Sequence, residues 1–448
     1  MRVEVANAIQ TAMWTYYPDL LAAPVPRYTS YPTAAQFSDS VGAADLAARL
    51  DAVADDATLS LYVHIPYCHD ICWYCGCNTG SANRSQRVAS YVDALEREIA
   101  LVSARLAGRG RVRRIAFGGG SPNSLPLVDF VRLLHQIILC FGIGAADISV
   151  ELDPRRLDAQ WAAAMGAVGV GRVNMGVQTF APHVQAGIGR IQPLDMVERA
   201  MADLRHSGVG DIGFDLLYGL PGQSLADLSD TLDHSIALAP ARVALFGYAH
   251  MPHLLPRQRR IDGQALPNMD QRFAMAALGY DRLTAAGYQA IGFDHFALPH
   301  DNLAVAARNG KLRRNFQGFT DDDSDVLIGL GASAISMFPD LLVQNEKNVG
   351  RYRMLVSADR LPAARGVTRS VRDQRIGRLI EDILCNQSIV LGDEDVGPAL
   401  AHFETRGLVA RDGPVLRRLP GGLPYVRAIA ATFDPYLRPE ERRFSNAI

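Results

Sequence analysis

Six strand-like runs alternate with helical segments through the middle of this chain, and this alternation limits the possible folds more than any other feature. The strand-like runs are Leu59–Ile65, Arg114–Phe117, Asp147–Leu152, Arg172–Val177, Ile212–Tyr218 and Val243–Ala249. Helical periodicity covers Val88–Leu106, Leu125–Cys140, Met196–Ser207 and Ser224–Ala237. Apolar strands separated by helices form a parallel sheet with helices on its faces. The pattern predicts an α/β fold, and six units, too few for a closed eight-stranded barrel, predict an open or partial one.

The pattern is lost at both ends of the chain. Residues 1–50 contain P-R-Y-T-S-Y-P-T-A, whose two prolines and lack of period predict an extended N-terminal arm. We place the partial barrel at residues 51–335 and a smaller, mainly helical domain at residues 336–448. Within that domain, G-L-V-A-R-D-G-P-V-L predicts a short hairpin. A length of 448 residues is long for one domain and comfortable for two.

Charge and hydropathy argue against several functions and locations. The net charge is −2 and no basic block is present, so general electrostatic binding of nucleic acid is not expected. No run of 18 apolar residues occurs, which predicts no membrane span. The first stretch, M-R-V-E-V-A-N-A-I-Q, lacks the unbroken apolar core of an export signal. We therefore expect a cytoplasmic protein.

Four of the six cysteines lie within ten residues, directly after the first strand. They are Cys68, Cys72, Cys75 and Cys77, with the spacing C-x3-C-x2-C-x-C. Three thiolates on one tight loop can bind three irons of a cubane cluster and leave the fourth iron open. A structural zinc usually has two separated C-x2-C pairs, and a disulfide needs an oxidising compartment. The spacing favours an iron–sulfur cluster over both. Cys140 and Cys385 lie in apolar runs and are expected to be buried.

Polar and glycine residues follow the other predicted strands at the same edge of the sheet. They are Gly118, Gly119, Gly120, Ser121, Glu151, Asp153, Gln178, Arg190 and Asp215. Glycines allow a ligand to approach the backbone closely. The carboxylates, amide and guanidinium suit a zwitterionic ligand, with Arg190 binding a carboxylate and the acids binding an amine and ribose hydroxyls.

These motifs resemble those of the radical S-adenosylmethionine (SAM) enzymes, and in particular the oxygen-independent coproporphyrinogen III oxidases. The resemblance rests on P-R-Y-T-S-Y-P-T, Y-V-H-I-P-Y-C, C-G-C-N, G-G-G-S-P, Y-A-H, F-D-H-F-A, R-N-F-Q-G-F-T, G-A-S-A-I-S and the terminal F-D-P-Y-L. It covers nearly the whole chain and is weakest over residues 385–430. It implies a partial (β/α)6 barrel with an N-terminal arm and a helical C-terminal domain.

The resemblance also implies a ligand set, and names no catalytic side chain beyond the cluster and SAM. Cys68, Cys72 and Cys75 match ligands of a [4Fe–4S] cluster, whereas Cys77 matches a cysteine that is not a ligand. One SAM molecule is matched by Tyr62, Gly119, Glu151 and Ile335. Further SAM contacts are matched by Tyr74, Gly120, Ser121, Gln178, Arg190, Asp215 and Ala249, and positions near a second SAM by Leu217, Phe316 and Gln317. Tyr74 stands where the family often has Phe, and Ser121 where it often has Thr.

The reaction implied is the oxidative decarboxylation of two propionates of coproporphyrinogen III to vinyl groups. The product is protoporphyrinogen IX, two SAM molecules are consumed, and an unidentified donor supplies electrons to a monomeric enzyme. Cations should bind the substrate propionates, and the candidates are Arg27, Lys311, Arg313 and Arg314. An alternative is a haem-binding or haem-transfer protein on the same scaffold, but such relatives tend to lack the residue matching Cys77 and the R-N-F-Q-G-F-T segment. A third is a radical SAM enzyme with an unrelated substrate.

Overall fold

A curved parallel sheet forms the centre of the computed structural model, which describes residues 14–391 and 397–437. The six predicted strands are confirmed as β1 (Thr58–Ile65), β4 (Arg111–Gly119), β5 (Asp147–Leu152), β6 (Val170–Gln178), β7 (Asp211–Tyr218) and β8 (Arg242–Gly247). They pair in this order, each parallel to the next. All their C-terminal ends therefore meet at one rim of the sheet.

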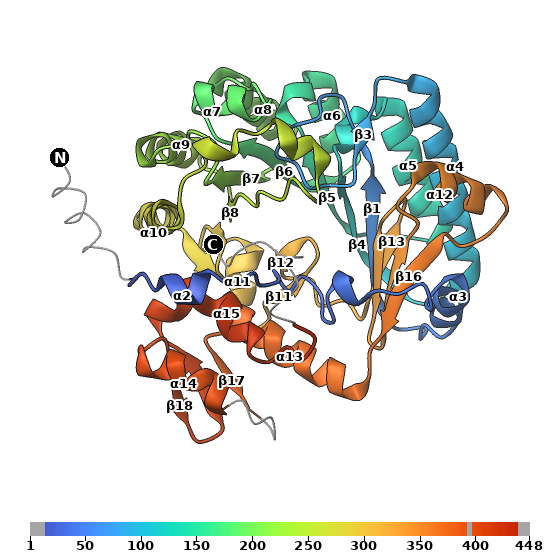
Figure 1. Ribbon diagram of the computed structural model, residues 1–448. Coiled ribbons are helices and arrows are strands. Elements are labelled where there is room, and N and C mark those ends of the chain that lie inside the picture. The colour runs from blue at the N-terminus through green and yellow to red at the C-terminus, as the bar shows by residue number, and fades with distance from the viewer. Residues whose placement is uncertain (1–13, 392–396, 438–448) are drawn as a thin grey trace.

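Helices cover the outer face of this sheet, as Figure 1 shows. They are α4 (Ser85–Leu106), α5 (Leu127–Cys140), α6 (Ala159–Ala167), α8 (Leu194–His206), α9 (Leu225–Leu238) and α10 (Met269–Ala285). In α4 the residues Val88, Val92, Leu95, Ile99 and Val102 recur every three or four positions and are buried. Burying each such side chain contributes about 1.5–3 kcal/mol, so this one face anchors the helix to the sheet.

The sheet extends beyond the six predicted strands at both edges. In the described residues it has 12 strands in the order β16-β15-β14-β13-β1-β4-β5-β6-β7-β8-β10-β9. β13 (Val326–Leu330) runs parallel to β1, and β14 (Ile335–Phe338), β15 (Leu341–Asn345) and β16 (Ala363–Thr368) follow it antiparallel. The division at residue 335 stays a prediction, although one sheet continues past it to Thr368.

The arm and the C-terminal region pack together below the sheet. The arm carries α2 (Pro18–Leu21) and α3 (Ala43–Asp51), and its first thirteen residues lie outside the described part of the chain. The C-terminal region contains α13 (Val371–Cys385), β17 (Ser388–Val390), α14 (Gly397–Thr405), β18 (Val409–Asp412), β19 (Val415–Arg418) and α15 (Val426–Ala431). The predicted hairpin is confirmed as the antiparallel pair β18–β19.

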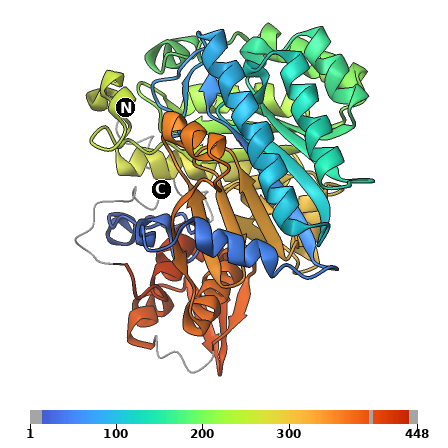
Figure 2. The ribbon, with the colours of Figure 1, turned by 90° about the vertical axis from the view of Figure 1, so that its right-hand side faces the viewer.

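The views in Figures 1 and 2 agree that the arm passes between the barrel and the C-terminal region. One apolar cluster joins all three, since it includes Trp14 and Tyr28 of the arm, Phe273 of α10 and Ile380 and Tyr425 of the C-terminal region. The arm is therefore a packed wall of the molecule. No helix among the described residues is long and apolar enough to span a membrane.

Candidate active site

The cysteine loop is held at the rim of the sheet by backbone hydrogen bonds at its ends and middle. Gly80 donates to the Pro66 carbonyl and Ala82 to the Cys68 carbonyl, each at 2.9 Å. In the middle, the Trp73 amide donates to the Ile188 carbonyl at 3.0 Å. The loop therefore has a fixed shape, and its thiols are presented at the C-terminal end of β1.

The thiols of this loop interact with one another. Burial, together with Cys75 and Cys72, raises the pKa of the Cys68 thiol to about 12. A hydrogen bond from the Cys77 side chain lowers the pKa of Cys75 to about 6, and the Cys77 amide also donates to Cys75 Sγ at 3.3 Å. Cys77 thus contacts the Cys75 sulfur, an arrangement suited to a residue that supports a ligand.

Two guanidinium groups lie against Cys72. Arg190 Nη1 is 3.2 Å and Arg155 Nη2 is 3.3 Å from Cys72 Sγ. Hydrogen bonds from such groups stabilise anionic sulfur and tune an iron–sulfur cluster. No three His, Cys, Asp or Glu side chains in the described residues converge on a single metal ion. A cubane cluster does not need that convergence, because each thiolate binds a different iron, and the soft donors and nearby cations fit the cluster.

The glycine run after β4 packs tightly beneath the cysteine loop. A Cβ on Gly120 would lie 2.3 Å from the Tyr67 carbonyl oxygen, so only glycine permits this approach. Gly119 has a φ of +103°, and its amide donates to Glu151 Oε2 at 3.2 Å. Burial raises the pKa of Glu151. The run thus brings a buried carboxylate from β5 next to the loop.

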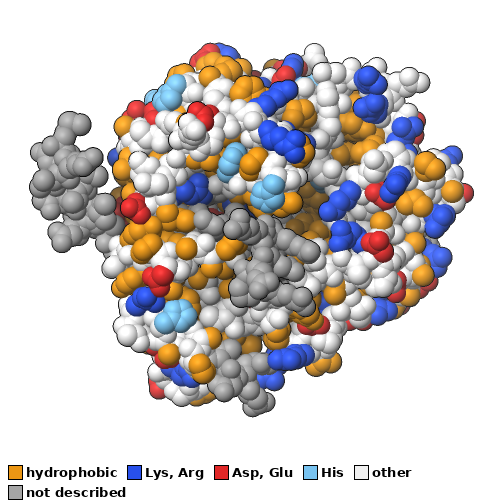
Figure 3. All heavy atoms as spheres, in the orientation of Figure 1, with side chains coloured by type: hydrophobic (Ala, Val, Ile, Leu, Met, Phe, Trp, Pro, Cys, Tyr) orange, Lys and Arg blue, Asp and Glu red, His pale blue; other side chains and the backbone are white. Residues whose placement is uncertain are grey.

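A cavity of about 510 Å³ opens beside these groups. Five residues predicted as cofactor contacts line it: Tyr62, Gly119, Glu151, Phe316 and Gln317. The last two sit at the tip of the hairpin formed by β11 (Arg313–Asn315) and β12 (Gly318–Thr320). The Phe316 ring centroid is 5.7 Å from that of Tyr62. This size is typical of small-molecule sites. On the face in Figure 3, Lys, Arg and His side chains border a hollow near its centre.

Arg190 connects the cysteine loop with the polar ends of β5 and β6. Its Nη2 donates to Asp153 Oδ1 at 3.3 Å and to the Gly176 carbonyl at 2.5 Å, and its Nε donates to Gln192 Oε1 at 2.9 Å. Burial alone would lower the pKa of Arg190, but Tyr74 and Asp153 raise it above its usual value. Arg190 therefore stays charged inside the site.

Asp215 and Gln178 are held in unfavourable states near Arg190. Burial, followed by repulsion from Glu151, raises the pKa of Asp215 to about 7. Gln178 ends β6 with a φ of +67°, in the left-handed region that non-glycine residues rarely adopt. Such strain collects at functional sites because the surrounding structure must hold it.

Comparison with known proteins identifies the family. The radical SAM superfamily matches residues 62–234. An oxygen-independent coproporphyrinogen III oxidase of Bradyrhizobium diazoefficiens is 41% identical over 437 residues, covering 95% of this chain and 97% of that protein. One from Paracoccus denitrificans is 38% identical, covering 93% and 95%. The solved structure of coproporphyrinogen III oxidase (HemN) from Escherichia coli, described as a radical SAM enzyme, superposes with a TM-score of 0.87 at 35% identity, covering 92% of this chain and 98% of that one.

The chain belongs to the oxygen-independent coproporphyrinogen III oxidase family. Its fold is the α/β radical SAM fold, as predicted. As a member of this family, the chain places its remaining predicted contacts around the same rim. Leu217 and Tyr74 belong to one apolar cluster, and the Tyr74 and Ala249 carbonyls accept from Gln258 Nε2 at 2.8 and 3.1 Å. Ser121 Oγ accepts from the Asp153 amide at 3.1 Å. Ile335 pairs with Gln344, which lines the cavity.

Several residues of this family member's site were not singled out from the sequence. His64 lies two positions after Tyr62 on β1, and its Nδ1 is 3.5 Å from the Tyr62 hydroxyl. Burial lowers the pKa of His64 to about 4, which keeps it neutral. The two-residue period of a strand places both on one face and could have indicated it. Arg155, Arg257 and Lys347 reach the site only through packing between distant segments, which no local pattern reveals.

The four cations predicted for the substrate propionates lie in different surroundings. Lys311 and Arg313 are exposed, and Arg313 Nε donates to Glu381 at 3.0 Å. Arg314 is buried against the rings of Phe293 and Phe319. Arg27, on the arm, donates to the Gly247 carbonyl at the end of β8. Of the four, Arg27 has the placement best suited to a ligand that enters the sheet rim.

Proposed function

We propose that this chain converts coproporphyrinogen III to protoporphyrinogen IX without oxygen. Each of two propionates loses a hydrogen atom from its β-carbon, one electron and CO2, and becomes a vinyl group. The observation that carries this proposal is family membership over nearly the full length of the chain and of its relatives, with the three-thiol loop at the sheet rim.

The cofactors are a [4Fe–4S] cluster and two SAM molecules per turnover. Together they supply the species that removes hydrogen from the substrate. Cys68, Cys72 and Cys75 hold the cluster, and the Cys77 amide supports the Cys75 sulfur. Arg190 and Arg155 offset negative charge at Cys72.

The protein side chains bind and orient the cofactor and substrate. Glu151 and Asp215 are buried carboxylates that offer acceptors to the amine and hydroxyl groups of SAM. Arg190 stays charged and binds a carboxylate of SAM. The hairpin tip with Phe316 and Gln317 covers the cavity beside Tyr62 and excludes water from it.

Partners and location follow from this chemistry. A protein or small-molecule reductant must deliver electrons to the cluster, and the porphyrinogen is the substrate. A reducing cytoplasm would keep the six free thiols reduced. We expect the chain to act there as a monomer.

Anaerobic turnover tests the proposal. Coproporphyrinogen III, SAM and dithionite are incubated with the reconstituted protein, and protoporphyrin is measured by fluorescence after oxidation, alongside methionine. Both products should form, and Cys75→Ser should form neither. Methionine without protoporphyrin from the unaltered protein would instead indicate a radical SAM enzyme with another substrate.

A further inference from the structure

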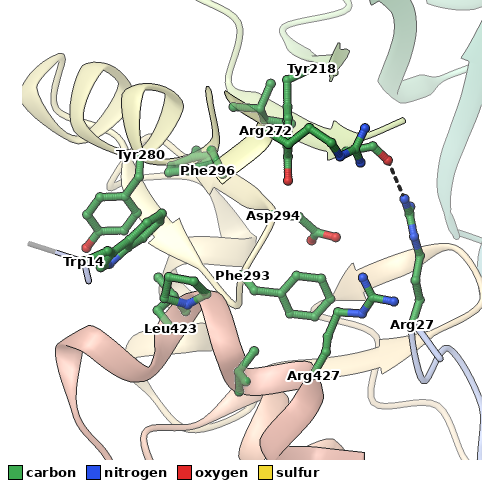
Figure 4. A pocket seen from close by; sticks show the side chains of 15 residues that line it. Trp14, Arg27, Tyr218, Arg272, Tyr280, Phe293, Asp294, Phe296, Leu423 and Arg427 are labelled. Atoms are coloured by element: carbon green, nitrogen blue, oxygen red, sulfur yellow. Dashed lines mark hydrogen bonds between the residues drawn. The ribbon is translucent and has the colours of Figure 1, made fainter. Parts of the chain in front are cut away.

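A second, smaller cavity lies where the arm, the sheet and the C-terminal region meet, and Figure 4 shows its lining. It measures about 60 Å³. Because a water needs only about 10–15 Å³ measured in this way, the cavity has room for a carboxylate group but none for a tetrapyrrole. It lies next to the proposed active site, since Gly247 and Tyr218 in its wall end β8 and β7.

Three arginines from different parts of the chain converge on this cavity. Arg27 comes from the arm, Arg272 from α10 and Arg427 from α15, and Figure 4 shows their side chains directed toward the space around Asp294. Their hydrogen bonds to backbone carbonyls orient them. Arg27 Nη2 donates to Gly247 O at 2.9 Å, Arg272 Nη1 to Gly219 O at 3.4 Å, and Arg427 Nε to Pro26 O at 3.2 Å.

The cavity wall carries more positive than negative charge. Asp294 is the one acid among the described residues that line it, and its Oδ1 is already 2.6 Å from His295 Nδ1. Burial and then Arg27 lower the pKa of Arg427 to about 9, and burial lowers that of Arg272. These shifts mean that the guanidinium groups are strained as cations in this place. An anion entering the cavity would relieve that strain.

We propose that Arg27, Arg272 and Arg427 form a carboxylate cradle for one propionate of the porphyrinogen, and that this propionate is one the product retains. This inference rests on the proposed function. The macrocycle itself stays outside the small cavity, toward the larger one beside Tyr62, and the propionate reaches in as an arm. Guanidinium forks match carboxylate geometry, which suits this pairing.

The cradle suits a retained propionate because of the charge change in the reaction. A carboxylate that leaves as CO2 loses its negative charge. Contacts that stabilise the carboxylate before reaction, and not in the transition state, raise the barrier to that loss. Three buried guanidinium groups would therefore slow decarboxylation of the group they hold. Two of the four substrate propionates survive, and the cradle holds one of these to position the reacting pair.

Binding of substrate and product separates this proposal from its alternatives. Coproporphyrinogen III and protoporphyrinogen IX are dialysed anaerobically against the cluster-loaded protein without SAM, so no turnover occurs. Arg27→Gln and Arg272→Gln should each weaken binding of both porphyrinogens by about tenfold, equal to about 1.4 kcal/mol. Arg308→Gln, an exposed arginine bonded to Gln289, is the matched control and should bind both normally.

Two further readouts distinguish the cradle from a structural effect. SAM dissociation constants and iron content of both variants should equal those of the unaltered protein, and Arg272→Lys should recover part of the lost affinity. Unchanged binding of both porphyrinogens would overturn the cradle. Weakened binding of the substrate alone would overturn the assignment to a retained propionate, since the product lacks the reacting ones. Failure of the unaltered protein to bind either porphyrinogen would overturn the proposed function, and the cradle with it.

Discussion

Buried carboxylates occur in two regions of this molecule and are treated differently in each. Glu98 of α4 is almost fully buried and accepts from the Gly331 amide at 2.6 Å, from Asn345 Nδ2 at 2.7 Å and from the Tyr352 hydroxyl at 2.6 Å. At the rim, Glu151 accepts only from the Gly119 amide among the described residues. Asp215 has no hydrogen-bond donor in that part of the chain. Burial raises the pKa of all three.

The difference separates a structural carboxylate from carboxylates reserved for a ligand. Glu98 ties α4 to the segments after β13 and β15 and to α12 (Val349–Ser357), using only groups of the protein. Glu151 and Asp215 carry the cost of burial without those partners. Substitution at Glu98 should therefore change stability, and substitution at the rim should change binding.

The largest expected effect is on stability at Glu98. Glu98→Ala leaves the Gly331 amide and Tyr352 hydroxyl without their acceptor and opens a small cavity, which should cost about 3–5 kcal/mol of unfolding free energy. Thermal and urea unfolding measure it. Asp93→Ala, an exposed acid on the same helix, is the control and should cost little. A Glu98→Ala protein as stable as its parent would break the comparison.

Asp215 should show the opposite sign, with a pH dependence. Because the folded state raises the pKa of Asp215 to about 7, it binds the proton more tightly than the unfolded chain does. The free energy of unfolding therefore falls as pH rises from about 4 through 7. Asp215→Asn removes this loss and should gain about 2 kcal/mol more stability at pH 8 than at pH 5.

Unfolding of the SAM-free protein at these two pH values measures the effect of Asp215→Asn. In the control Asp195→Asn, the exposed carboxylate is bonded to Arg199, which lowers its pKa, so no gain at pH 8 is expected. Equal stability changes for Asp215→Asn at both pH values would show that the buried carboxylate carries no such cost.

Arg190→Ala should weaken SAM binding by roughly 30-fold, as the loss of a buried charge-assisted pair costs on the order of 2 kcal/mol. Equilibrium dialysis with cluster-loaded protein measures it, and iron content shows that the cluster is retained. Arg156→Ala is the control, because that exposed arginine bonds Asp70 at the same loop. An unchanged SAM dissociation constant would remove Arg190 from the binding site.

The smallest effect is expected for Glu151→Gln. The amide oxygen can still accept from Gly119, so stability should stay the same or rise. The lost charge should weaken SAM binding by about tenfold. Asp147→Asn, at the opposite end of the same strand, should leave SAM affinity unchanged. A large loss of stability in Glu151→Gln without loss of affinity would place Glu151 with Glu98.

The sequence predicted the six barrel strands well, because buried parallel strands are short apolar runs with clear ends. It did not predict that β13 would pair with β1, since Thr58 and its partner Asp325 are 267 residues apart and no local pattern encodes such a pairing. The same limit hid β14 to β16, whose residues carry no β-α alternation to mark them as part of the sheet.

The cysteine loop was visible in the sequence because its chemistry depends on spacing within ten residues. The cradle was only partly visible. Arg27 was a candidate, but Arg272 on α10 and Arg427 on α15 meet it only after the arm packs against both. Likewise, Arg155 lies near Cys72 through the turn after β5, a contact set by three-dimensional packing.

The pairing of β1 with β13 has a consequence for how the protein is made. The cysteine loop leaves the ribosome early, yet the far wall of its cavity comes from Phe316, Gln317, Ser333 and Gln344. At a synthesis rate of 5–20 residues per second, the loop waits on the order of 10–50 s for that wall. A nascent chain therefore exposes its thiols before it can enclose a cofactor, and cluster loading belongs after translation has passed β15.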